Sequence, residues 1–378
     1  MTDEMKIRSG LAAALLVFLV TGAGCTRDAW KGTMVKEGDV TVVRNPKEPL
    51  YRTPVLELQE ELSLGGPEAR GDFAFDQIRD AVLDDAGSLH VLDGRSGQVK
   101  VFDASGAYLR TIGRMGQGPG EFERPMNLSI NRTTGELAVH EPGRMSFFRP
   151  DGVFARSVAY QGMGAVLGRV DSRGHIYRTE VVVDENGARY VAVKSGPDGT
   201  VLAELAGSPA PLSPKGGSSK VKVTALWPSS YFQLDQADNV VYGFPQTYDL
   251  TLFRGSDAKP FKRISRNYDP VGISAEEKKE FEKEVPPGSG IELEFPKYHS
   301  AYDRFFLSDL GHLFVRTWER TADGRRIHDV FDAEGRFIGR VPLKGTGLEI
   351  LNGKYYALEE DEEGYQYVKR YAVTWKIR

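Results

Sequence analysis

The sequence of 378 residues is poor in cysteine and histidine, the residues that form disulfide bonds and many metal sites. Its one cysteine, Cys25, excludes an intramolecular disulfide bond and any site made of several thiolates. Its six histidines show no HExxH spacing or other close ligand pattern. No GxSxG motif surrounds a serine, so the sequence does not predict acyl-enzyme chemistry. Apart from one possible metal site described below, we expect no cofactor.

The chain also lacks a large excess of charge and any long apolar run. Its 49 basic and 53 acidic residues are interspersed and leave a formal net charge of -4. Without an extended basic field, the sequence does not predict a nucleic-acid partner. The longest apolar run, residues 11–20, has about half of the roughly 20 residues that a membrane-spanning helix needs.

The apolar run belongs to a segment with the order of an export signal. Lys6 and Arg8 precede it, and the small residues 22–24 follow it, directly ahead of Cys25. This arrangement resembles the lipobox of bacterial lipoproteins, although Gly22 stands where lipoboxes usually carry leucine. The alternative is an ordinary secretory signal followed by an incidental cysteine.

The lipobox resemblance implies a signal peptide over residues 1–24, cleavage before Cys25 and acylation of that residue. It also implies an exported protein in the bacterial cell envelope, lipid-anchored on the periplasmic side of the outer membrane. Acyl chains bind bilayers through their buried methylene groups, at roughly 0.8 kcal/mol each. Residues 25–50 show weak periodicity, and we expect them to form a tether.

Residues 51–378 contain a repeat of short strands and tight turns. The 42 glycines and 20 prolines favour many short strands over long helices. A strand that ends in a Gly-containing turn recurs, with equivalent apolar positions at Phe102, Phe148, Val193, Phe253 and Phe331. The shortest spacings are about 45 residues, which is typical of propeller blades. The longer spacings predict insertions at about 206–225 and 270–296.

A second hairpin precedes each of these units, as at residues 81–93, and so predicts four-stranded antiparallel blades. The C-terminal residues 348–375 supply a sixth unit with three strands. We expect residues 56–62 to add the missing outer strand and close the ring, which removes open sheet edges. The predicted fold is all-β, a six-bladed β-propeller with one short helical insertion.

The helix is predicted in the second insertion. Ser274 and Glu277 form a capping box, and Pro286 follows the helical stretch. This helix forms either a lid or rim over one end of the propeller, or an insertion with only a structural role. The first insertion is rich in Pro, Gly and Ser and is typical of a flexible loop between blades.

Residues 116–125, at the first junction between blades, and the preceding run of residues 99–113 resemble NHL-type repeats and bacterial six-bladed propeller lipoproteins. The resemblance is strongest over residues 78–160. It implies a binding or scaffold module, although some relatives are lyases or lactonases. From it we expect a monomer that binds a peptide, glycan or protein.

Propellers usually bind ligands at one mouth of the central channel. Aligning the inner strands on their turns brings together a set of polar residues where these strands begin, with His299 on the approach to the fifth blade. The candidate ligand-binding residues are Arg79, Asp80, Asn127, Tyr231, His299, Asp303 and Arg304. Alternatively, the Arg and Asp side chains only neutralise one another in the channel.

Two functions remain open from the sequence. The first is a non-catalytic binding or scaffold propeller. The alternative is a metal-dependent lactonase or lyase, in which Asp80, Asn127 and Asp303 would supply oxygen ligands to one hard cation. Arg79 and Arg304 adjoin two of these ligands and count against a cation there.

Overall fold

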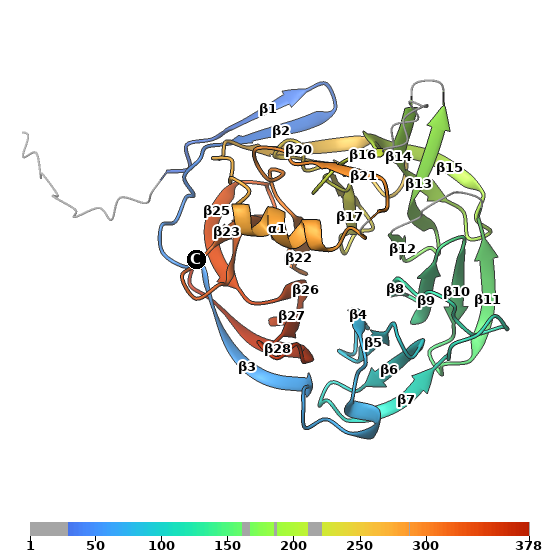
Figure 1. The fold of residues 1–378 in the computed structure, drawn as a ribbon. Helices are drawn as coiled ribbons and strands as arrows, with labels where there is room; N and C mark the ends of the chain where they lie inside the picture. Colours follow the sequence, from blue (N-terminus) through green and yellow to red (C-terminus); the bar gives the residue numbers. More distant parts are fainter. Residues whose placement is uncertain (1–28, 161–166, 185–186, 211–220, 287, 378) are drawn as a thin grey trace, which may run out of the picture.

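The computed structural model describes residues 29–160, 167–184, 187–210, 221–286 and 288–377. These residues form six four-stranded antiparallel blades in a ring around a central channel (Figure 1). The predicted six-bladed all-β propeller with one short helix is therefore confirmed. The predicted signal peptide, residues 1–24, and Cys25 lie outside the described residues. Within the described residues, no helix has the length and apolar character needed to cross a bilayer.

Each blade runs from an inner strand at the channel to an outer strand at the wall. Blade 1 consists of β4 (Ile78–Leu83), β5 (Leu89–Asp93), β6 (Gln98–Phe102) and β7 (Tyr108–Ile112). Blade 2 consists of β8 (Asn127–Asn131), β9 (Glu136–Glu141), β10 (Arg144–Phe148) and β11 (Phe154–Ala159). Blade 3 consists of β12 (Gly168–Val170), β13 (Ile176–Asp184), β14 (Gly187–Ser195) and β15 (Val201–Pro209). Blade 4 consists of β17 (Tyr231–Leu234), β18 (Val240–Gly243), β19 (Asp249–Phe253) and β20 (Pro260–Arg266). Blade 5 consists of β22 (Arg304–Leu307), β23 (Leu313–Arg320), β24 (Arg326–Phe331) and β25 (Phe337–Leu343). Blade 6 is β26 (Thr346–Leu351), β27 (Lys354–Glu360), β28 (Gln366–Trp375) and β3 (Leu56–Gly65). A 3-10 turn, η1 (Gly71–Phe73), precedes blade 1.

The turns between strands are set by aspartate and glycine. In blade 1, the Asp103 carboxylate accepts the backbone N–H groups of Ser105 at 2.8 Å and Ala107 at 2.9 Å. Gly106 completes this turn with a φ of 88°, a left-handed conformation that favours glycine. Such local bonds compete with continued pairing and end the strand where the sequence pattern predicts.

The apolar core lies between the blades rather than inside any one of them. Each pair of neighbouring blades encloses its own buried cluster, and Phe122, Val139 and Phe148 belong to the one between blades 1 and 2. The five apolar positions used to detect the repeat are all buried, and Phe102 and Phe331 are 0% exposed. A single blade is too thin to cover both of its faces, so stability depends on stacking around the whole ring.

The ring closes as the sequence predicts. Strand β3 pairs antiparallel with β28 along a register that runs from Leu56 opposite Trp375 to Gly65 opposite Tyr367. The N-terminal part of the described chain therefore supplies the outer strand of the last blade (Figure 1). This pairing covers the edge of β28 and gives blade 6 its fourth strand.

The predicted tether over residues 25–50 is wrong for part of its length. Residues 33–45 form a hairpin of β1 (Thr33–Glu37) and β2 (Val40–Asn45), and β2 pairs parallel with β20 at the edge of blade 4. Val42 and Val43 are buried in this contact. Their short apolar pair, surrounded by charged residues, has a periodicity too weak to distinguish a strand from a tether.

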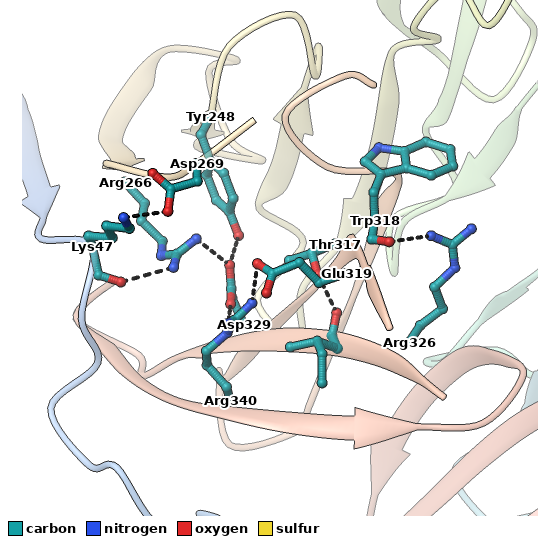
Figure 2. A network of polar contacts seen from close by, with 11 residues as sticks. Lys47, Tyr248, Arg266, Asp269, Thr317, Trp318, Glu319, Arg326, Asp329 and Arg340 are labelled. Carbon is teal, nitrogen blue, oxygen red and sulfur yellow. Dashed lines mark hydrogen bonds and ion pairs between the residues drawn. The ribbon is translucent and has the colours of Figure 1, made fainter. Parts of the chain in front are cut away.

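After β2 the chain is fixed at the boundary between blades 4 and 5. Asn45 accepts the N–H of Phe337 at 2.7 Å and donates to the carbonyl of Gly335 at 2.9 Å. Figure 2 shows the adjoining polar network, in which Arg266 donates to the Lys47 carbonyl at 3.0 Å and to Asp329 at 2.8 Å. The N-terminal segment is therefore part of the propeller wall.

The two insertions meet each other. The first contributes β16 (Val221–Thr224) and the second β21 (Ile291–Glu294), and these strands pair in parallel. The helix α1 (Ala275–Lys283) has the predicted capping box, in which Ser274 and Glu277 bond to each other's backbone N–H. Both insertions lead from an outer strand to the next inner strand, so both lie where the inner strands begin. We call this end of the channel the insertion mouth; Figure 1 shows α1 beside blade 5.

Candidate functional site: the insertion mouth of the channel

The central channel contains a cavity of about 1390 Å³. Its lining residues come from the inner strands of all six blades, for example Asp80, Leu128, Arg169, Gln233, Arg304 and Gly347. The hairpin tips between β23 and β24 and between β27 and β28 also line it. In an antiparallel blade these tips lie at the same end as the start of the inner strand, so they border the insertion mouth.

The structure brings four of the seven predicted site residues to this cavity. These are Arg79, Asp80, Tyr231 and Arg304. Asn127, His299 and Asp303 do not line it, and each of them contacts a neighbouring side chain instead.

Asp80 connects the inner strands of blades 1 and 2. Its Oδ2 accepts the N–H of Leu128 and its Oδ1 accepts the N–H of Ala81, both at 2.9 Å. Burial raises the pKa of this carboxyl above its ordinary value, although the nearby guanidinium groups of Arg169 and Arg304 oppose the shift. Asp80 is therefore a structural acceptor that faces two cations.

Asn127 connects blades 2 and 3. Its Oδ1 accepts the N–H of Gly168 and a guanidinium N–H of Arg169, both at 3.1 Å, and its Nδ2 lies 3.2 Å from Nδ1 of His140. Burial, with help from the charges of Arg169 and Arg178, lowers the pKa of His140 to about 3. A neutral imidazole suits this buried position between blades.

Asp303 forms an ion pair. Its Oδ2 accepts Nε of Arg316 at 2.6 Å and also contacts the Nη2 of the same residue. Nε of Arg304 lies 3.6 Å from the same oxygen.

The oxygen atoms of Asp80, Asn127 and Asp303 are thus already bonded to backbone or guanidinium donors, and the three do not form a ready ligand set. No three His, Cys, Asp or Glu side chains of the described chain lie close enough to hold a metal ion. A cation bound by Asp80, Asn127 and Asp303 would have to displace these donors.

His299 lies under the second insertion rather than in the cavity wall. Its Nε2 is 3.3 Å from the carboxylate of Glu277 on α1, and its ring stacks on Trp318 with centroids 4.1 Å apart. Burial lowers the pKa of His299 against the opposing effect of Glu277. On the same indole lies the guanidinium of Arg326, 4.8 Å from the ring centroid. His299 and Trp318 therefore connect α1 to the arginines of the insertion mouth.

The sequence alignment missed several residues of the cavity. Arg169 lies on the inner strand β12, Gln233 lies two positions beyond the candidate Tyr231 on β17, and their side chains bond at 3.1 Å. Alternate residues of a strand point to the same side, so continuing the alignment by two positions would have found both. Arg320 and Arg326 lie at the β23–β24 tip, where the density of arginine between residues 316 and 326 was the available signal.

Comparison with known proteins supports the same architecture. A family model described as a 6-bladed beta-propeller matches residues 68–165. No curated protein sequence matches the chain. Among solved structures, a candidate exported protein from Bacteroides fragilis has a TM-score of 0.57 at 12% identity, covering 89% of this chain and 100% of its own.

Two further solved structures are similar. A member of the DUF4221 family from Bacteroides vulgatus has a TM-score of 0.53 at 13% identity, covering 85% of this chain and 99% of its own. A gluconolactonase from Xanthomonas campestris has a TM-score of 0.45 at 14% identity, covering 79% of this chain and 88% of its own, and this likeness carries no argument about activity. The matched segment and the strand topology together identify a six-bladed β-propeller.

Proposed function

We propose that this protein is a non-catalytic binding or scaffold propeller, similar to NHL-repeat propellers, that takes a peptide, glycan or protein partner at the insertion mouth. One observation carries the proposal: a cavity of about 1390 Å³, lined mainly by polar side chains from all six blades, adjoins the mouth where both insertions meet. Ligands of proteins commonly bind in such concave sites with converging polar groups.

The proposal includes a location in the bacterial cell envelope. The segment 1–24 and Cys25 support export and lipid anchoring, with the protein on the periplasmic side of the outer membrane. The description of the Bacteroides fragilis structure as a candidate exported protein is consistent with export. We propose that the propeller acts there as a monomer.

The alternative, a metal-dependent lactonase or lyase, is less well supported. It needs free oxygen ligands on Asp80, Asn127 and Asp303, and all three accept hydrogen bonds from backbone or arginine donors. Metal analysis after dialysis tests it directly. A stoichiometric divalent cation that is retained by residues 29–378 and lost in Asp80→Ala would favour the alternative.

The binding proposal is tested with arrays of oligosaccharides and of peptides, probed with purified residues 29–378. We expect one ligand class to bind, and we expect Arg304→Glu to abolish that binding because it reverses a charge in the cavity. The control is Arg149→Glu, the same change at an exposed turn on the outer wall, where Arg149 pairs only with Asp151. Absence of binding on both arrays, or equal binding by Arg304→Glu, would contradict the proposal.

A further inference from the structure

The blade 5 wall of the cavity carries a high concentration of arginine. Five arginines of this blade line the cavity: Arg304, Arg316, Arg320, Arg325 and Arg326. The first begins the inner strand β22, and the other four belong to the β23–β24 hairpin. This hairpin reaches the insertion mouth, so its charges face an incoming ligand.

Carboxylates neutralise only two of these arginines closely. Arg316 is paired with Asp303, and Nε of Arg325 lies 2.8 Å from Asp323. Both ion pairs are formed within blade 5. They leave the charges of Arg304, Arg320 and Arg326 on the same wall.

The other three arginines have weak or no acidic partners. Arg304 contacts Asp303 at 3.6 Å, a carboxylate that already holds another guanidinium, and it lies near the buried Asp80, whose oxygens accept backbone N–H groups. Across the described part of the chain, no ion pair joins Arg320 or Arg326 to a carboxylate. Arg320 donates a hydrogen bond to the backbone carbonyl of Gly324 at 3.1 Å, and Arg326 donates to that of Trp318 at 3.0 Å. These carbonyls orient the guanidinium groups without neutralising them.

Arg326 is held in this position by an aromatic contact. Its guanidinium lies over the Trp318 ring, and the His299 ring also stacks on that indole. Burial, together with the charges of Arg320 and Arg316, lowers the pKa of Arg326 to about 10. Burial is the largest cause of this shift, and the carboxylates of Asp303 and Glu277 act against it.

Blade 1 adds a further cation to the same cavity. The side chain of Arg79 lies over Gly94, where an added Cβ would come within 2.5 Å of it. Its guanidinium contacts the uncharged sulfur of Met126 at 3.9 Å. Arg79 therefore also reaches the cavity, and within the described residues it forms no ion pair with a carboxylate.

The neighbouring blade 6 tip brings the acidic residues Glu359, Glu360, Asp361 and Glu362 to the same cavity. Glu359 and Asp361 accept hydrogen bonds from the phenols of Tyr371 and Tyr367 of their own blade. None of the ion pairs among the described residues joins Glu359 or Asp361 to an arginine of blade 5. The mouth thus has an acidic tip on blade 6 and a basic wall on blade 5.

We propose that Arg304, Arg320 and Arg326 bind an oxyanion of the ligand, a carboxylate, sulfate or phosphate group. This inference rests on the proposed function and specifies the chemical class that the insertion mouth recognises. The planar guanidinium group suits such anions because it donates parallel hydrogen bonds to two oxygen atoms.

The test uses calorimetric titration of residues 29–378 at low ionic strength with inorganic sulfate, inorganic phosphate and malonate as separate probes. We expect saturable binding at one site by at least one probe, weakened about tenfold or more in Arg304→Gln/Arg326→Gln because two charged donors are lost. Arg326→Lys keeps the charge and is expected to retain part of the affinity. Arg149→Gln on the outer wall is expected to bind as the wild type does.

Which probe binds distinguishes the sources of the oxyanion. Lack of saturable binding by all three, or equal affinity in the folded double variant, would overturn the inference; circular dichroism establishes that the variant is folded. The array experiment separates this failure from failure of the binding function. If a ligand binds on the arrays but none of the three anions binds, the propeller remains a binding module and the oxyanion site is refuted.

Discussion

At the scale of single residues, the chain buries charge where blades meet. Asp329 of blade 5 is 0% exposed and accepts hydrogen bonds from Tyr248 at 2.6 Å, Arg266 at 2.8 Å and Arg340 at 3.0 Å (Figure 2). Burial raises the pKa of this carboxyl, and the two guanidinium groups oppose the shift. The network connects blades 4 and 5 beside the N-terminal segment.

Removing the charge of Asp329 is expected to be strongly destabilising. Asp329→Asn leaves the buried Arg266 without its counter-charge, and breaking such a pair costs about 3–5 kcal/mol. Urea unfolding followed by fluorescence measures the loss in the free energy of unfolding. Asp323→Asn is the control, because this carboxylate is 58% exposed and its removal should leave the free energy of unfolding close to that of the wild type. Similar losses in the two variants would contradict a role for the network in stability.

Two buried histidines predict how stability depends on pH. Burial lowers the pKa of His140 and of His328 to about 3, whereas an unfolded histidine titrates near 6.5. The unfolded chain therefore binds protons that the folded chain refuses between these values. These groups leave stability unchanged above about pH 6.5 and reduce it as the pH falls toward 3.

Comparison of pH 7 and pH 4.5 tests this expectation. In His328→Gln we expect the difference between the free energies of unfolding at the two pH values to be smaller than in the wild type, whatever the overall stability of the variant. An unchanged difference, or a histidine resonance that titrates near pH 6.5 for this residue in the folded protein, would show that the imidazole is not buried as described.

At the scale of elements, the strand pattern was readable because each blade repeats the same local chemistry. The Asp103–Gly106 turn and its counterparts mark strand ends, and the apolar anchors face the gaps between blades. The capping box of α1 was equally local. The pairing of β16 with β21 was not predictable, because it joins segments far apart in sequence through short strands with little periodicity.

Ring closure by β3 leads to a prediction about truncation. Removal of residues 1–67 leaves blade 6 with three strands and exposes the edge of β28, so we expect loss of cooperative folding and aggregation. A chain that begins at residue 47 keeps β3 and loses only the β1–β2 hairpin, and it is expected to stay soluble with reduced stability. Equal denaturation midpoints for the chain lacking β3 and for residues 29–378 would refute the closing role.

At the scale of the whole molecule, the sequence predicted the ring but only part of its site. Asp80 and Arg304 reach the cavity because inner-strand alignment is a local property. Asn127 and Asp303 do not line the cavity, because their side chains contact His140 and Arg316 instead. Buried polar groups usually form hydrogen bonds with neighbouring residues. The arginines of the β23–β24 tip depend on the length of that hairpin, which the repeat does not specify.

The envelope location makes a separate prediction. In cells given a palmitate analogue, the full-length chain is expected to incorporate label and to fractionate with outer membranes. Cys25→Ala should lose the label and appear in the soluble periplasmic fraction, because the acyl chains provide the membrane affinity. Label that persists in Cys25→Ala would remove the lipoprotein interpretation while leaving the propeller unaffected.

The most direct test of the account is a crystal structure of residues 29–378 with the highest-affinity ligand from the arrays. We predict that the ligand lies in the insertion mouth, with an acidic group within hydrogen-bond reach of Arg304 and Arg326. A ligand seated on the outer wall, or at the opposite end of the channel, would contradict the account.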